Sequence, residues 1–111
     1  MDKKVFLVKS EELGSGPEQL GTILMSVFMR MLGENKNKPA KIIFLNAGVK
    51  LCCEGSKILE YLETLEGQGV ELLCCTTCLE YFELKDKIKV GKPTTMPKTI
   101  EALYEYEVVS L

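Results

Sequence analysis

The chain has 111 residues, of which 46% are hydrophobic and 27% are charged, and its net charge is −2. This length and composition fit one globular domain over residues 1–111 and exclude a disordered chain. The slight negative charge argues against nucleic acid or an anionic membrane as the main partner, because both attract basic surfaces.

The N-terminal third of the chain predicts a strand followed by a helix. Lys4–Lys9 is expected to be a buried strand, and Gly14, Gly16 and Pro17 form the loop that introduces a helix. Gly33 ends that helix. Apolar residues that recur at spacings of three and four predict its buried face, which consists of Leu20, Ile23, Leu24, Val27, Phe28, Met31 and Leu32.

A second strand and helix follow. Lys41–Asn46 is the second predicted buried strand. Ser56 is expected to cap a helix that ends at Gly67 and Gly69. The apolar spacing predicts that this helix buries Ile58, Leu59, Leu62 and Leu65.

The third strand is predicted at Val70–Cys75, and Thr76 or Thr77 is expected to cap a short helix that ends at Leu84. Weaker patterns complete the chain: a strand at Ile88–Val90, a loop at Pro93–Pro97, a helix at Thr99–Tyr106 and a strand at Val108–Leu111. Alternation of strands and helices with short connections predicts an α/β fold, a small doubly wound, mostly parallel five-stranded sheet flanked by helices, roughly flavodoxin-like.

The five cysteines are the chemically distinctive residues. Their number is odd, and the short apolar run Val5–Val8 cannot serve as a signal peptide or membrane span. We therefore expect a cytoplasmic protein with reduced thiols, no membrane partner and no nucleic-acid partner. The chain contains no histidine, which excludes Ser-His and Cys-His catalytic pairs and histidine-bearing zinc sites.

Topology separates the cysteines into two classes. Ligands and chemistry gather at the carboxyl ends of parallel strands, where Cys75 and Cys78 follow the third strand. Cys74 is expected to pack inside the strand as a small hydrophobic residue, and Cys52 and Cys53 belong to the loop after the second strand. The CxxC spacing and a helix N-terminus both favour the thiolate, so Cys75 is the predicted reactive sulfur with Cys78 one helical turn below it.

Three segments resemble the DsrE/DsrF-like sulfur-relay family, and in particular the C-terminal domain of YedF-type proteins. They are LCCTTCLEYFELKDKIKVGK around the cysteines, GSGPEQLG before the first helix, and FLNAGVKL with EGS after the second strand. One departure is visible, because the family commonly has glycine at the position of Glu83. YedF-type proteins usually carry an N-terminal TusA-like domain, which this sequence lacks, so we expect a free-standing or an excised domain.

The resemblance implies a trimer or hexamer, with a dimer as a further option, that carries sulfur as a persulfide on Cys75. Cys78 matches the second cysteine of the YedF-like subgroup, which is associated with selenium metabolism. Sulfur donor and acceptor proteins are the implied partners. No cofactor and no metal are expected, and Asn46, Gly48, Lys50 and Cys53 are predicted to line the pocket.

The leading interpretation is a sulfurtransferase-like persulfide carrier that uses Cys75 and Cys78. The alternative is a non-catalytic oligomeric scaffold or partner-binding module whose cysteines are structural, since free cysteine is among the most buried residue types. A third interpretation, a Cys-ligated metal site, would need Cys52 or Cys53 to complete the ligand set, because only one CxxC is present.

Overall fold

Five parallel strands form the centre of the molecule. The computed structural model describes residues 3–111, and all strand pairings in it are parallel. The sheet order is β4-β3-β2-β1-β5. The strands are β1 (Lys4–Val8), β2 (Lys41–Phe44), β3 (Glu71–Cys75), β4 (Lys92–Thr94) and β5 (Glu107–Ser110).

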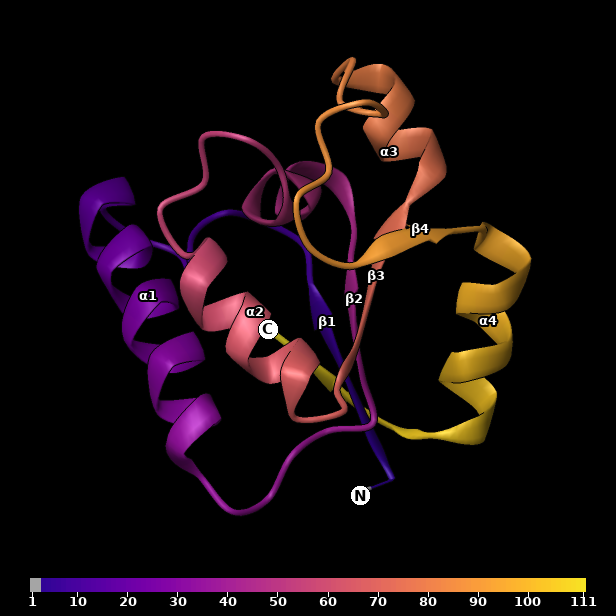
Figure 1. Cartoon of the computed structure of the whole chain (residues 1–111), viewed down its shortest axis with the longest axis horizontal. Helices are drawn as coiled ribbons and strands as arrows, with labels where there is room; N and C mark the ends of the chain where they lie inside the picture. Colours follow the sequence, from indigo (N-terminus) through magenta and orange to yellow (C-terminus); the bar gives the residue numbers. More distant parts are fainter. Residues whose placement is uncertain (1–2) are drawn as a thin grey trace.

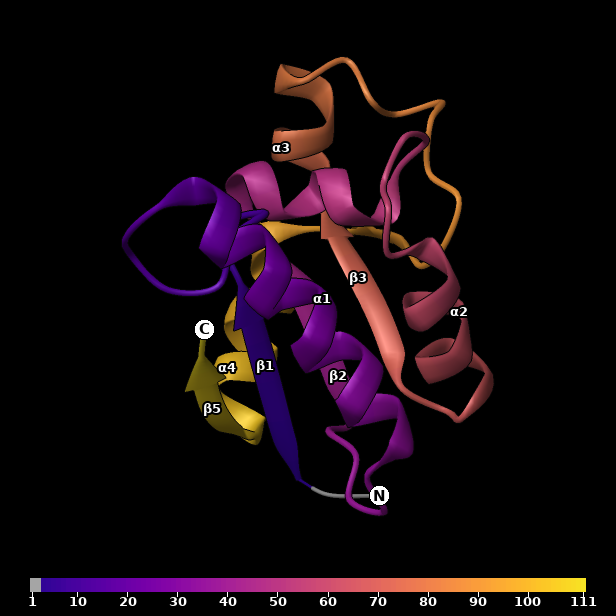
Figure 2. The same cartoon turned by 90° about the vertical axis from the view of Figure 1, so that its left-hand side faces the viewer.

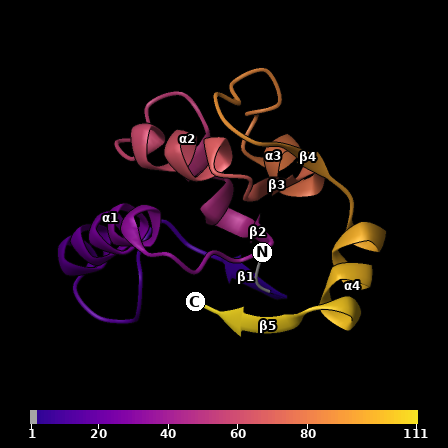
Figure 3. The same ribbon diagram turned by 60° about the horizontal axis from the view of Figure 1, so that its bottom comes forward.

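Helices cover both faces of this sheet, which confirms the predicted α/β class (Figure 1). Helices α1 (Glu18–Glu34) and α2 (Leu59–Gly67) lie on one face, and α4 (Met96–Glu105) lies on the other (Figure 3). The short helix α3 (Thr76–Tyr81) and the 3₁₀ helix η1 (Asn46–Cys52) lie beyond the carboxyl ends of the strands (Figure 2). None of the helices in residues 3–111 is long and apolar enough to cross a membrane.

Strand alternation divides the core between the two faces. Ile42 and Phe44 of β2 belong to the large cluster beneath α1 and α2, whereas Ile43 belongs to the small cluster beneath α4. Successive side chains of a strand point to opposite faces, so an apolar run such as KIIF serves both clusters. The second helix buries Leu62 and Leu65 as expected.

The fourth strand lies after its predicted position. Ile88 forms only an isolated antiparallel bridge with Cys53, and Gly91 turns the chain at a positive φ of 79° into β4. Pro93 lies in this strand, within the segment predicted to be a loop. Because β4 is an edge strand, its proline costs no interior hydrogen bond. The loop prediction was therefore wrong.

The predicted helix caps also differ from the structure. Ser56 accepts a hydrogen bond from the Ile58 N–H at 3.3 Å, but α2 begins only at Leu59. Cys75 is the N-cap of α3, and no side chain caps that helix. The side-chain cap that does form belongs to α4, where the Thr95 hydroxyl accepts from the Lys98 N–H at 3.4 Å.

The predicted buried face of α1 was wrong. The helix buries Gly21, Met25 and Met29, with Phe28 and Leu32 packed at the border of the core. The remaining residues of the predicted face are exposed: Leu20, Ile23, Leu24, Val27 and Met31. Because α1 is apolar around most of its circumference, its periodicity fits two different faces, and only packing against the sheet and α2 selects one.

Candidate functional site

Cys78 and Asn46 come together at the carboxyl edge of the sheet. Cys78 lies on α3, directly after β3, and Asn46 begins η1 after β2. The backbone N–H of Asn46 donates a hydrogen bond to the Cys78 sulfur, with 3.0 Å between nitrogen and Sγ. This contact joins the connections after two neighbouring strands, as expected for the carboxyl edge of a parallel sheet.

The conformation of η1 sets the direction of that amide. Asn46 has a positive φ of 51°, a region that asparagine tolerates better than most residues. On its N-terminal side, the Leu45 N–H donates to the Val8 carbonyl at 2.9 Å. On its C-terminal side, a Cβ at Gly48 would lie 2.3 Å from the same carbonyl oxygen. Only glycine permits this approach, so the loop is held tightly against the end of β1.

The two cysteines of the CxxC pair differ in accessibility. Cys75 is only 3% exposed, whereas Cys78 is half-buried. An open hollow of about 390 Å³ borders Cys78, and it is lined by Asn46, Thr77, Cys78, Tyr81 and Phe82. Among the described residues, Cys78 is the one cysteine that is not buried.

The surroundings of Cys78 act on its pKa in opposite directions. Partial burial raises the pKa of the thiol, and its hydrogen bond with the Cys75 thiol adds to the rise. The Asn46 N–H lowers the pKa of Cys78, because it donates to the charged sulfur, but the net shift is upward. Cys78 is therefore mainly a protonated thiol near neutral pH. The hydrogen bond from the Asn46 N–H stabilises the sulfur most strongly once the sulfur carries a negative charge.

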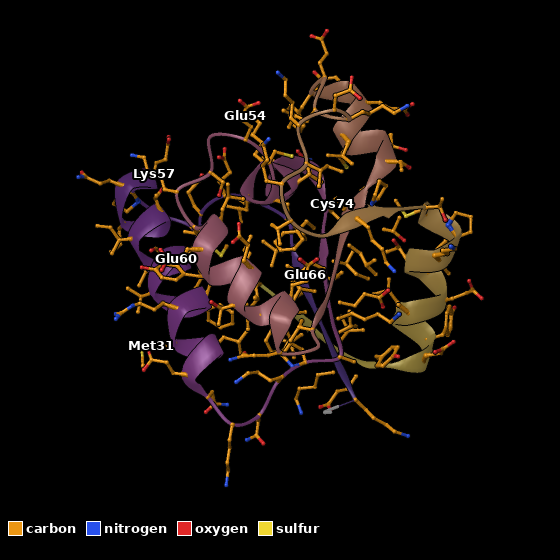
Figure 4. All side chains as sticks on the ribbon, in the orientation of Figure 1. Met31, Glu54, Lys57, Glu60, Glu66 and Cys74 are labelled. Atoms are coloured by element: carbon orange, nitrogen blue, oxygen red, sulfur yellow. The ribbon has the colours of Figure 1, made fainter. Side chains whose placement is uncertain are left out.

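The other three cysteines, Cys52, Cys53 and Cys74, form an inner group inside the core. Cys52 and Cys74 are fully buried, and the hydrogen bond between them, followed by burial, raises the pKa of Cys52 strongly. The Cys53 thiol donates to the Val49 carbonyl at 3.2 Å, and burial raises the pKa of Cys53 to about 11. The prediction that Cys74 packs as a hydrophobic residue is confirmed (Figure 4).

The predicted pocket residues lie around two separate hollows. Asn46 lines the hollow beside Cys78, whereas Lys50 and Cys53 line a neighbouring one of about 300 Å³. Phe82 separates the two hollows and contributes to both, and the Lys50 ammonium lies 4.5 Å from its ring centroid. Gly48 is buried, and its contribution is to let the backbone of η1 approach the end of β1.

The sequence did not single out the aromatic side of the hollow. Tyr81 and Phe82 flank Cys78, with their ring centroids 5.2 Å apart and their planes nearly perpendicular. Tyr81 is 81% exposed. The helical spacing could have predicted that both rings lie beside Cys78, because residues three and four positions apart lie on the same side of a helix.

A metal centre is not supported by the residues that the structure describes. Within residues 3–111, no group of three or more Cys, Asp or Glu side chains is arranged to hold a metal ion. A structural zinc site takes about four such ligands. The five thiols instead divide into the inner group of three and an outer pair, Cys75 and Cys78.

Comparison with known proteins gives a fold but no family assignment. No protein-family model matches the chain, and no curated protein matches it in sequence. Solved structures do match it, among them two that align over the full length of both chains. They are the ychN protein from E. coli, with a TM-score of 0.75 and 17% identity, and MTH1491, a protein of unknown function from Methanobacterium thermoautotrophicum, with a TM-score of 0.74 and 15% identity. At these identities the likeness shows the fold alone, and that fold is DsrE-like.

Proposed function

We propose that the protein is a persulfide carrier in which Cys78 receives a sulfane sulfur and Cys75 serves as the second thiol. The observation that carries the proposal is the hydrogen bond from the Asn46 N–H to the accessible Cys78 sulfur. A fixed backbone donor 3.0 Å from a sulfur is suited to stabilise the negative charge of a thiolate or persulfide.

The transfer needs no external oxidant or reductant. The Cys78 thiol loses its proton and attacks the terminal sulfur of a donor persulfide, R–S–SH. The new S–S bond forms at Cys78 while the donor S–S bond breaks, and the donor leaves as a thiolate that takes up the proton. An acceptor thiolate then attacks the terminal sulfur, and Cys78 leaves with its electron pair. Selenium in place of the transferred sulfur would follow the same steps.

We expect Cys75 to discharge the persulfide of Cys78. Its thiolate can attack the Cys78 sulfur of a Cys78 persulfide, which forms a Cys75–Cys78 disulfide and releases HS⁻. The sequence favours Cys75 as the first acceptor, and this order of roles remains a prediction. Accessibility favours the reverse order, because Cys75 is 3% exposed and Cys78 borders an open hollow.

The hollow suits a donor presented by another protein. It is open, and its Tyr81 is 81% exposed, whereas Phe82 is partly buried against the core. Tyrosine is enriched among the residues that dominate binding energy at protein interfaces. Sulfur donor and acceptor proteins are therefore the partners that we propose.

Mass spectrometry after incubation with a low-molecular-weight persulfide tests the proposal. We expect an adduct of roughly one sulfur, about 32 Da, on Cys78. Cys78→Ser should abolish the adduct, Cys75→Ser should retain and prolong it, and the buried control Cys53→Ala should load normally. Loading of Cys75 in the Cys78→Ser variant would restore the role order that the sequence predicts. No loading at either cysteine of the wild type would refute the carrier and leave the scaffold interpretation.

A further inference from the structure

A hollow of about 310 Å³ lies between α4 and the neighbouring strands β2, β3 and β4. It is on the face of the sheet that α4 covers (Figure 3) and shares no lining residue with the hollow beside Cys78. Small-molecule sites in proteins have volumes of about 300–1,000 Å³. This hollow therefore has room for one small ligand, at a place that the proposed thiol chemistry does not use.

The sheet side of the hollow is polar. Leu73 belongs to the small cluster beneath α4, and strand alternation turns Glu71, two positions earlier, to the same face. The Glu71 carboxylate pairs with the Lys41 ammonium at 2.9 Å and with the Lys92 ammonium at 3.0 Å. Its hydrogen bonds to these two lysines lower the pKa of Glu71. The charges of this wall are therefore paired within the protein.

The α4 side of the hollow carries charges that are not paired. Lys98, Glu101 and Glu105 line the hollow, and their spacing of three and four residues places them on one flank of the helix. None of the three forms an ion pair with another of residues 3–111. Lys98 and Glu101 are about 4.5 Å apart along the helix axis, so the flank presents opposite charges one turn apart.

Thr94 supplies an unpaired hydroxyl to the same hollow. It is only 4% exposed and lines the hollow, yet its hydroxyl forms no hydrogen bond within residues 3–111. Thr99, the other buried polar residue in that range, donates to the Thr95 carbonyl at 3.0 Å. No fully enclosed side-chain nitrogen or oxygen in residues 3–111 lacks a partner, so the Thr94 hydroxyl opens into the hollow. Because buried hydroxyls are nearly always hydrogen-bonded, this group indicates a partner that enters from outside.

We propose that this hollow binds a free α-amino acid through its zwitterionic end. The ligand carboxylate accepts hydrogen bonds from the Lys98 ammonium and the Thr94 hydroxyl, and the ligand ammonium donates to the Glu101 carboxylate. The ligand side chain lies against Leu73 and Ala102, which are apolar residues of the lining. Binding thus gives a partner to each of the three groups that the protein leaves unpaired here.

The charge balance of the lining favours a zwitterion over a simple anion or cation. Three lysines and three glutamates line the hollow: Lys41, Lys92, Lys98, Glu71, Glu101 and Glu105. Their formal charges cancel, so a simple anion or a simple cation meets no net attraction. A ligand that carries both charges can pair with both signs, and a free amino acid is the smallest common ligand of this kind.

An NMR titration of the full chain tests the proposal, with each standard L-amino acid as the probe. At least one amino acid should bind saturably below about 10 mM and shift the amide signals of β4 and α4. Its N-acetyl derivative lacks the ammonium and its amide derivative lacks the carboxylate, so each should bind at least about tenfold more weakly. Equal binding by either derivative, shifts confined to the hollow beside Cys78, or no binding by any amino acid would overturn the proposal.

Matched substitutions identify the residues that hold the ligand. Lys98→Gln and Glu101→Gln each remove one exposed charge and should weaken binding at least about tenfold, whereas Thr94→Val removes the hydroxyl and should weaken it about fivefold. The thermal midpoint of unfolding should change little in the two glutamine variants, because their sites are exposed. The control Lys89→Gln changes an exposed lysine outside the hollow and should bind like the wild type. Unchanged binding in both Lys98→Gln and Glu101→Gln would refute the site.

Discussion

The inner group of cysteines and the outer pair occupy neighbouring positions in the chain but different environments. Cys74 and Cys75 are adjacent in sequence, yet Cys74 is hydrogen-bonded to Cys52 in the core and Cys75 is the N-cap of α3. Cys78 lies one turn further and reaches a hollow beside Asn46. The hydrogen bond to Cys74 and burial raise the pKa of Cys52, and burial raises the pKa of Cys53. Cys78 instead accepts a backbone hydrogen bond and borders an open hollow.

The difference shows that connectivity at the sheet edge sets the exposure and the hydrogen bonds of each thiol. Cys53 and Cys78 both follow strands and lie at the same edge of the sheet. Each borders a hollow, but Cys53 is buried and its thiol donates to the Val49 carbonyl, whereas Cys78 is partly exposed and accepts the Asn46 N–H. This follows from α3 leaving the sheet while η1 folds back onto β1.

Thiol labelling should separate the two groups most strongly. Native protein treated with iodoacetamide is expected to react at Cys78 at least about 1,000-fold faster than at Cys52, Cys53 or Cys74, because buried thiols react only in opened states. Peptide mapping over time measures the four rates. In denaturant all cysteines should react at similar rates, which is the control. Fast labelling of an inner cysteine in native protein would show that burial does not protect the inner group from reaction.

Alkaline pH should destabilise the fold through the inner group. The folded-state pKa of Cys53 is about 11 against an ordinary 9.0, so its stabilising contribution is present below pH 9 and is lost as pH rises toward 11. The expected loss of unfolding free energy from this thiol is about 2–3 kcal/mol, with a slope of up to about 1.4 kcal/mol per pH unit. Urea denaturation at several pH values measures it.

The matched variant for that experiment is Cys53→Ala. It removes the titrating thiol, so the unfolding free energy should fall less steeply between pH 9 and 11. A residual slope is expected from Cys52, whose pKa is also raised. An unchanged slope in Cys53→Ala would show that this thiol does not govern alkaline stability.

Two substitutions of Asn46 should distinguish its backbone from its side chain. Asn46→Gly keeps the N–H and the positive φ, so the labelling rate of Cys78 at pH 7 should stay within about twofold of the wild type. Asn46→Val disfavours that φ and displaces the amide, and the lost charge-assisted hydrogen bond should slow the reaction about tenfold. The pH profile of labelling should shift upward only in the valine variant. An equal fall in the labelling rate of both variants would show that the Asn46 side chain, and not its backbone N–H, promotes the reaction of Cys78.

The smallest effect is expected at the end of α3. Glu83 has a φ of 57° and occupies the C′ position of a Schellman motif, in which the Leu84 N–H donates to the Leu79 carbonyl and the Glu83 N–H to the Glu80 carbonyl. Glu83→Gly should raise the unfolding free energy by about 1 kcal/mol, because glycine adopts this conformation without strain.

The control for that substitution is Glu83→Ala, which removes the carboxylate but keeps the Cβ and should give no such gain. Thermal and urea denaturation of both variants measures the difference. Equal stabilisation by the two substitutions would trace the effect to the lost charge and not to the backbone.

Much of the fold could be predicted because it depends on local patterns. The strands KVFLV, KIIF and ELLCC are short apolar runs between polar turns, and their alternation with helices fixes a parallel α/β sheet. β4 escaped prediction because its three residues, KPT, have no strand pattern of their own and are held only by pairing with β3.

Local sequence patterns suffice to predict the α/β class, the burial of Cys74 and the location of the CxxC pair at the carboxyl edge of the sheet. Tertiary structure decided which side of α1 is buried, that Cys78 is more accessible than Cys75, and that the Asn46 amide reaches the sulfur across 32 positions of the chain. The reason is physical. Periodicity records which residues are apolar, whereas exposure and hydrogen bonds between distant segments depend on how close two backbones come, here through Gly48 against Val8.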